Sequence, residues 1–449
     1  MKFAQRMSRL GTETAFEVLV RAKALEAKGR DVVHLEIGEP DFDTPLNVVE
    51  AGRAALAAGA THYTPAQGIP ELREAIARDA SARRGITFDS ADVVVTPGGK
   101  PIMFFTILAL VDAGDEVIYP NPGFPIYESM IDFAGGRAVP IPIEEGRDFS
   151  LDVDQLCSLI GPRTRMVILN SPHNPTGGVL PRAALEAIAD ACRRHPDVIV
   201  LSDEIYSRMI YEGEHFSIAA LPGMRERTVV LDGFSKTYAM TGWRLGYGIF
   251  PHELAPAVSR LMTNSNSCTA TFTQMAGAEA LTGPQETPAA MVEEFRRRRD
   301  LIVPGLNAIR GVTCRVPHGA FYVFPNITGT GRSSREVADL LLEEAGVAVL
   351  SGTAFGKYGE GYIRLSYANS MENIQKALDR MKASLEGRAV AVGLRAAGVG
   401  TAKAAAPAKA RANGTKRASG ANGVTGAAKS GNGRRPARPS TATTAKVDG

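Results

Sequence analysis

The 449-residue sequence lacks several features that mark secreted, membrane-spanning and metal-binding proteins. Its four cysteines form no Cys-x-x-Cys pair and no metal-ligand spacing, so we expect no metal and a reducing compartment. The longest apolar run, residues 101–111, is much shorter than the ~20 residues of a membrane-spanning helix. The start of the chain lacks the apolar core of a signal peptide. From these absences we expect a cytoplasmic protein without a membrane partner.

The formal net charge of +3 is divided unevenly along the chain. Of the 51 basic and 48 acidic residues, 12 basic and one acidic residue lie after residue 387, so the tail carries +11 and the preceding part −8. The tail is rich in Ala, Gly, Lys and Arg and has no Phe, Trp or Tyr. This composition predicts a disordered basic tail over residues 387–449. Its charge could attract nucleic acid, and the simpler alternative is a solvated extension without a catalytic role.

The rest of the chain has an ordinary globular composition, 44% hydrophobic and 22% charged, and it is long enough for more than one domain. Short strand-like apolar runs alternate with stretches of helical spacing. The strand-like runs are residues 93–96, 116–119, 166–169, 198–201, 228–231 and 245–250. This alternation predicts an α/β fold with a mainly parallel sheet, which gathers ligand groups at the carboxyl ends of its strands.

The segment 233–246 (GFSKTYAMTGWRLG) follows the predicted strand 228–231 and places Lys236 eight residues before Arg244. A lysine in apolar surroundings favours its neutral, nucleophilic amine, which forms a Schiff base with an aldehyde. A nearby arginine is suited to holding a phosphate through its planar guanidinium. Schiff base and phosphate together suggest pyridoxal phosphate. For this segment alone, a surface lysine in a loop is an equally good interpretation.

Two further motifs follow predicted strands. The segment 171–178 (SPHNPTGG) contains Asn174, and the segment 202–206 (SDEIY) contains Asp203 and Tyr206. A carboxylate such as Asp203 can keep a pyridine nitrogen protonated, so that the ring accepts the electrons left when an amino acid loses its alpha proton. Taken singly, Asn174 fits a turn and Asp203 fits a helix cap. Three such motifs at strand ends are much harder to attribute to chance.

The segment 96–100 (TPGGK) joins the predicted strand 93–96 to the apolar run 101–111, which is predicted to be a buried helix. Its glycines let the backbone come close to a ligand, and free amides at a helix start attract phosphate. The Gly-x-x-x-x-Gly-Lys-[Ser/Thr] spacing is absent, so the segment is not a P-loop. The turn therefore predicts a phosphate site near Gly99 and Lys100.

These motifs resemble those of the class I aminotransferases of the fold-type I pyridoxal phosphate family, closest to the bacterial aspartate aminotransferase-like branch. The resemblance covers nearly all of residues 8–386. It implies that Lys236 carries the cofactor, that Arg244 binds its phosphate and that Asp203 pairs with the pyridine nitrogen. The other implied cofactor contacts are Gly99, Lys100 and Ser235, Phe124 against the ring, and Asn174 and Tyr206 at the phenolic oxygen. Tyr63 is implied to reach the partner subunit's cofactor in a homodimer with shared active sites.

The resemblance also implies a substrate site. Arg364 lies in the strand-like segment 362–367 (YIRLSY), where a charge is costly unless it is paired. The resemblance assigns it to the substrate alpha-carboxylate, and a structural ion pair is the alternative. Gly38, Phe124 and Asn174 are the further implied substrate contacts. Taken without the resemblance, Gly38 could be a plain strand-to-turn glycine and Phe124 could be loop packing.

Two charged residues bear on the choice of substrate. Lys100 matches a position that contacts the distal carboxylate of the substrate in the aspartate-preferring branch. Glu17 stands where that branch tends to carry a hydroxyl side chain. An acidic side chain near an acidic substrate is unfavourable unless it points elsewhere, which weakens the expectation of dicarboxylate preference.

The resemblance finally implies a domain layout and an activity. Residues 45–288 would form the large cofactor-binding domain, and residues 1–44 and 289–386 a smaller α+β domain made from both chain ends. The implied activity is transfer of an amino group from an L-amino acid, either aspartate or a neutral or aromatic one, to a 2-oxo acid such as 2-oxoglutarate. A pyridoxal phosphate-dependent carbon–sulfur lyase, and a ligand-sensing regulator built on the same fold, are the alternatives.

Overall fold

The computed structural model describes residues 1–387. The predicted disordered tail lies outside the described residues, apart from Gly387. Within residues 1–387 no helix is long and apolar enough to cross a membrane.

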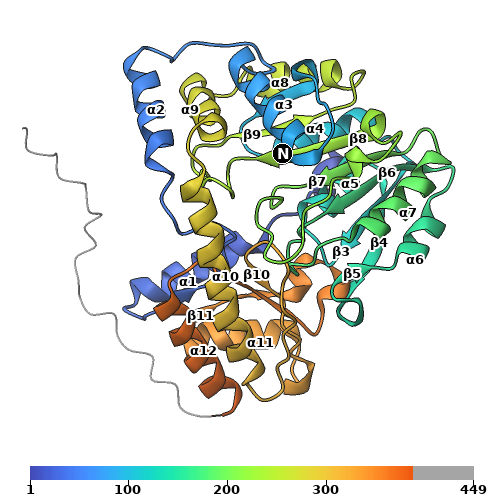
Figure 1. The fold of residues 1–449 in the computed structure, drawn as a ribbon. Helices are drawn as coiled ribbons and strands as arrows, with labels where there is room; N and C mark the ends of the chain where they lie inside the picture. Colours follow the sequence, from blue (N-terminus) through green and yellow to red (C-terminus); the bar gives the residue numbers. More distant parts are fainter. Residues whose placement is uncertain (388–449) are drawn as a thin grey trace, which may run out of the picture. The chain divides into compact units, whose positions relative to one another are not determined.

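An eight-stranded sheet forms the centre of the described part (Figure 1). The strands from β8 through β7, β6 and β3 to β4 are parallel, whereas β9 and β5 run antiparallel to their neighbours. This arrangement confirms the predicted α/β fold with a mainly parallel sheet. In order across the sheet, the strands are β2 (Val93–Thr96), β9 (Gly246–Ile249), β8 (Thr228–Gly233), β7 (Ile199–Asp203), β6 (Thr164–Asn170), β3 (Glu116–Asn121), β4 (Arg137–Glu144) and β5 (Ser150–Leu151).

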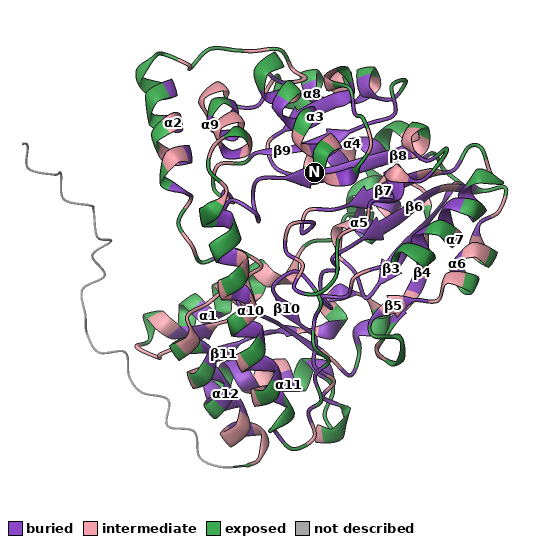
Figure 2. Cartoon of the chain, viewed as in Figure 1, coloured by how far each residue is buried: buried purple, intermediate pink, exposed green. Residues whose placement is uncertain are grey.

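Both faces of this sheet are covered by helices, which is why its strands are continuous apolar runs and do not alternate with polar residues. Successive strand residues point to opposite faces. In β6, Ile168 packs in the core with α4, α5 and α8, whereas Val167 packs in the core with α6 and α7. Figure 2 shows buried strands inside helices whose outer surfaces are largely exposed.

The helices take their positions from local sequence signals. The buried side of α7 is formed by Leu185, Ile188 and Cys192, spaced as on one face of a helix. The helix α3 ends at Gly85, which adopts the left-handed conformation common at helix ends. The helices are α1 (Thr14–Ala27), α2 (Leu46–Ala57), α3 (Pro70–Arg84), α4 (Lys100–Leu110), α5 (Ile126–Ala134), α6 (Val153–Leu159), α7 (Arg182–Arg193), α8 (Ala255–Asn266), α9 (Thr271–Thr282), α10 (Glu286–Asn307), α11 (Ser334–Leu340), which a π-helical turn continues over Leu341–Ala345, and α12 (Met371–Leu385).

The N-terminal and C-terminal parts of the described chain pack together. β1 (Val33–His34) pairs in parallel with β11 (Val347–Ala348). A separate antiparallel sheet has the order β10 (Tyr322–Val323), β13 (Ile363–Ser366) and β12 (Leu350–Ser351). The helix α10 packs against α12 beside these strands. The division into domains at residues 44 and 288 stays a prediction.

Candidate active site

A cleft of about 530 Å³ lies where the carboxyl ends of the central strands face β13 and the segment after β1. All but one of the predicted site residues line it. They are Gly38, Gly99, Lys100, Phe124, Asn174, Asp203, Tyr206, Ser235, Lys236, Arg244 and Arg364. The exception is Tyr63, whose side chain is 87% exposed. Its contact with a partner subunit stays a prediction.

Lys236 lies three residues after the end of β8 and points into the cleft. Its Nζ donates a hydrogen bond to the carbonyl of Gly38. Burial disfavours the charged ammonium and lowers the pKa of Lys236 to about 8, although the nearby carboxylates of Glu39 and Glu13 oppose this shift. A large fraction of the amine is therefore neutral near pH 8, as a nucleophilic lysine requires.

Asp203 is the last residue of β7 and is buried in the cleft floor. Its carboxylate accepts hydrogen bonds from the hydroxyl of Tyr127 at 2.6 Å and from the backbone N–H of Ile205 at 3.3 Å. Burial raises the pKa of Asp203 to about 6. The sequence analysis did not assign Tyr127, although it lies only three residues after Phe124 in the same segment.

Asn174 and Tyr206 also line the cleft. The Asn174 backbone N–H donates to Oδ1 of Asn170 at 2.9 Å, while the buried Oδ1 of Asn174 has no partner among residues 1–387. The hydroxyl of Tyr206 lies 2.7 Å from the hydroxyl of Tyr322. Tyr322, which the sequence analysis missed, lies so close to Gly38 that a Cβ there would collide with its hydroxyl.

The turn before α4 and the guanidinium of Arg244 form a basic cradle at one end of the cleft. Arg244 donates to the carbonyls of Thr241 at 2.8 Å and Pro97 at 3.3 Å. A Cβ at Gly98 would collide with its Nη2, so the guanidinium lies directly against this turn. Positive charge beside a helix N-terminus is a suitable environment for a phosphate. Ser235 lines the same cleft.

Arg364 occupies the middle of β13 and is only 3% exposed. Its Nη2 donates to the carbonyl of Glu36, and its guanidinium lies 4.6 Å from the ring centroid of Tyr322 and 5.2 Å from that of Phe355. Its Nε has no hydrogen-bond partner among residues 1–387. Burial lowers the pKa of Arg364 from its usual value. A buried guanidinium with spare donors is suited to a carboxylate that arrives with a substrate.

Lys100 begins α4, and its ammonium forms an ion pair with the carboxylate of Glu13. The same ammonium lies 5.7 Å from the ring centroid of Phe124. Glu13 lines the cleft, whereas Glu17 is exposed and is not among its lining residues. Glu13 and Glu39 both line the cleft, and Glu13 is the one paired with Lys100, so the concern that the sequence analysis attached to Glu17 applies to Glu13.

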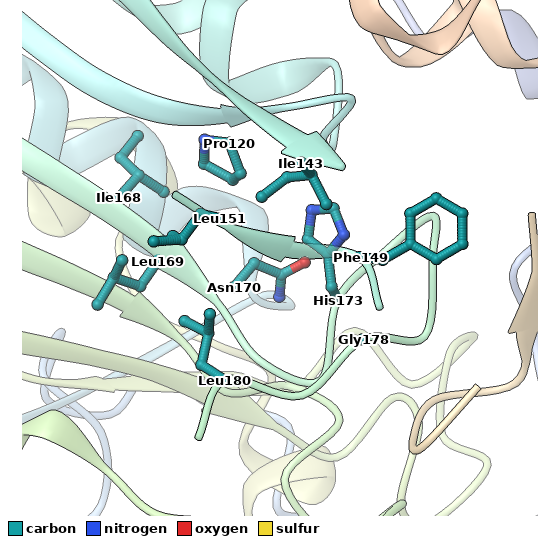
Figure 3. A pocket seen from close by; sticks show the side chains of 10 residues that line it. All are labelled: Pro120, Ile143, Phe149, Leu151, Ile168, Leu169, Asn170, His173, Gly178 and Leu180. Carbon is teal, nitrogen blue, oxygen red and sulfur yellow. The ribbon is translucent and has the colours of Figure 1, made fainter. Parts of the chain in front are cut away.

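A much smaller cavity of about 10 Å³ is lined in part by Ile168, Leu169 and Asn170 of β6 (Figure 3). It shares Asn170 with the cleft, and apart from His173 its other lining is mainly apolar. His173 is buried beside Thr176, 2.8 Å from its hydroxyl, and burial lowers the pKa of His173 to about 3. With room for about one water molecule, this cavity cannot hold a substrate. The cleft of about 530 Å³ is the candidate active site because it gathers the predicted site residues.

The sequence and the fold are similar to those of known proteins. Residues 30–381 match the family model for aminotransferase class I and II. The chain is 44% identical to an aspartate aminotransferase of Pyrococcus abyssi over 357 residues, which is 79% of this chain and 91% of that protein. It is 42% identical to an aromatic-amino-acid aminotransferase of Thermococcus litoralis over 359 residues, 79% of this chain and 92% of that protein. The structure of the Rhizobium meliloti aspartate aminotransferase superposes with a TM-score of 0.82 at 38% identity, covering 86% of this chain and 99% of that chain.

Proposed function

The chain belongs to the class I and II aminotransferases, and we propose that it uses pyridoxal phosphate to move an amino group from an L-amino acid to a 2-oxo acid such as 2-oxoglutarate. The observation that carries this proposal is the cleft itself. It brings together an amine with a lowered pKa on Lys236, the buried carboxylate of Asp203 and the buried guanidinium of Arg364.

The residues of the cleft fit the cofactor in three respects. The buried Oδ1 of Asn174 lacks a hydrogen-bond donor among residues 1–387 and would receive one. The cradle of Arg244 and Gly98 suits a phosphate. The carboxylate of Asp203 is held in a buried site that disfavours its charge, and a cationic ring nitrogen would stabilise it. When bound, pyridoxal phosphate supplies an aldehyde that condenses with amines and a ring that accepts electrons from the alpha carbon.

Lys236 has two tasks in the proposed mechanism. Its Nζ would hold the cofactor through its aldehyde. When it is free, the same Nζ would remove the proton from the substrate alpha carbon. An amine with a pKa of about 8 has a usable basic fraction near neutral pH and is mostly basic above pH 8, and its conjugate acid returns the proton readily.

The other residues orient the reactants. Arg364 would bind the alpha-carboxylate of the substrate, which fixes the alpha carbon and the direction of its C–H bond relative to Lys236. Asp203 would keep the ring nitrogen protonated, and Tyr127 holds its carboxylate in place. Phe124 would cover one face of the ring, with Asn174 and Tyr206 at its phenolic oxygen.

We also propose a homodimer in the cytoplasm. Exposed large apolar side chains support a dimer, since several lie on the N-terminal segment and α2: Phe3, Met7, Leu10, Phe16, Val20, Leu46 and Leu56. The four cysteines are free thiols, as in a reducing compartment. Sedimentation analysis of the purified protein tests the oligomeric state. If Tyr63 completes the partner's site, mixing Tyr63→Ala subunits with Lys236→Ala subunits should restore one wild-type site per heterodimer.

One assay distinguishes the proposed reaction from its alternatives. The protein is incubated with pyridoxal phosphate and a panel of amino acids, with and without 2-oxoglutarate, and the products are identified. Glutamate formed only when both substrates are present supports amino transfer. Release of thiol, ammonia and a 2-oxo acid without an acceptor would indicate a carbon–sulfur lyase. Ligand binding without turnover of any amino acid would indicate a regulator.

A further inference from the structure

The ion pair between Lys100 and Glu13 lies inside the cleft and joins two distant parts of the chain. Lys100 is the first residue of α4, and Glu13 immediately precedes α1. Their side chains are 48% and 16% exposed, so the carboxylate is the more enclosed partner. Glu13 is not among the predicted cofactor contacts, whereas Lys100 is predicted to contact both the cofactor and the distal end of the substrate.

The surroundings of this pair are apolar. Two apolar side chains follow the charged pair in the sequence: Phe16, in the first turn of α1, and Met103, a neighbour of Lys100 on α4. Both line the cleft, together with Ala15 and Ile37. The Phe124 ring lies under the ammonium of Lys100 at 5.7 Å. This end of the cleft therefore offers hydrocarbon and aromatic surface around a charge that is already neutralised.

A substrate side chain with a carboxylate would meet an unfavourable field here. It must either displace Glu13 from Lys100 or approach the ammonium with a second negative charge beside it. Two like charges about 4 Å apart repel by several kcal/mol at the effective dielectric of a protein surface, which offsets the attraction of Lys100. An uncharged side chain pays neither penalty, and it gains the apolar contact.

We propose that Glu13 is a specificity-determining residue, which neutralises Lys100 and thereby makes the cleft favour amino acids with aromatic or large apolar side chains over aspartate and glutamate. This inference rests on the proposed function, because it assumes that the substrate side chain reaches this end of the cleft. Glu13 acts on the choice of substrate and takes no part in moving the proton.

The test compares ligand binding to the pyridoxal phosphate-loaded wild type, Glu13→Gln and Glu17→Gln. Calorimetry gives the Kd of maleate, an unreactive dicarboxylate, and of 3-phenylpropanoate, an unreactive aromatic monocarboxylate. Glu17→Gln is the matched control, since it removes the same charge from an exposed position outside the cleft. Wild type and Glu17→Gln should prefer 3-phenylpropanoate. Glu13→Gln should shift the ratio of the two Kd values toward maleate by roughly tenfold.

A second variant shows whether the gain depends on Lys100. In the double variant Glu13→Gln/Lys100→Ala, the shift toward maleate should disappear. Steady-state kinetics should give the same order, with the kcat/KM of Glu13→Gln rising for aspartate relative to phenylalanine, chiefly through KM. A wild type that prefers maleate, or a Glu13→Gln variant with the wild-type ratio, overturns the role of Glu13. Failure of every variant and the wild type to transfer amino groups would instead refute the proposed function, because the binding ratios are measured without turnover.

Discussion

Replacing Arg364 by Ala should separate binding function from structural function more sharply than any other single change. In the proposed complex the guanidinium forms a desolvated, bidentate pair with the substrate alpha-carboxylate. Losing one partner of such a pair costs ~2 to 5 kcal/mol, which corresponds to a loss of roughly 30-fold to several thousand-fold in kcat/KM. Because every amino acid carries the alpha-carboxylate, the loss should be similar for acidic and neutral donors.

The effect of the same change on stability should be small. In the free protein the Arg364 guanidinium has a carbonyl and two aromatic rings as partners, and its desolvation lowers its pKa. Two cation–π contacts and one hydrogen bond from a charged donor are worth ~3 to 7 kcal/mol together. The penalty of burying the charge is also several kcal/mol. These contributions nearly cancel, so the free energy of unfolding should change by no more than ~2 kcal/mol.

The assay measures kcat/KM for one acidic and one neutral amino acid, and urea unfolding of the same preparations. Arg364→Lys keeps the charge but loses the planar fork, so it should recover only part of the activity. A large loss of stability with nearly unchanged kcat/KM would mean that Arg364 is a structural residue. A loss confined to aspartate and glutamate would place Arg364 at the distal end of the substrate, and the proposed orientation would be wrong.

Three further predictions concern the cofactor side of the cleft. Lys236→Ala should abolish nearly all turnover, because the attachment point and the proton carrier are lost together; borohydride reduction of the wild type followed by peptide mapping should find the cofactor on Lys236 and on no other lysine. The Asp203→Ala variant should retain some cofactor, but its transamination rate should be lower by ~10²-fold or more, and Asp203→Glu should be less impaired. A wild-type rate for Asp203→Ala would mean that Asp203 has only a structural role. The rate at which the cofactor-free protein takes up pyridoxal phosphate should rise between pH 6 and 8 and level off above pH 9. The reason is that the reactive amine is the deprotonated form and burial lowers the pKa of Lys236 to about 8. Stopped-flow absorbance measures this rate, and an inflection near the ordinary lysine pKa would contradict the prediction.

Much of the fold and of the cleft follows from local sequence. The predicted strand 228–231 lies within β8, and the predicted strand 198–201 forms most of β7. Both are continuous apolar runs, which suit a sheet that is buried on both faces. Parallel strands present their carboxyl ends at one edge, so motifs that follow such strands must meet. That rule places Asn174, Asp203 and Lys236 in one cleft before any coordinates are known. Their roles toward the cofactor stay predictions.

The details of the cleft depend on contacts between distant segments, which leave no periodic signal in the sequence. Sequence reasoning pointed to Glu17, but the path of the chain into α1 brings Glu13 to Lys100. Tyr322, on β10, contacts both Arg364 on the neighbouring strand β13 and Tyr206 after β7. Gly38 follows β1, as the alternative interpretation of a strand-to-turn glycine had it, yet it lacks the left-handed backbone that would require glycine. Only the folded structure reveals that its missing side chain leaves room for the hydroxyl of Tyr322, because that steric limit exists only once both segments are packed together.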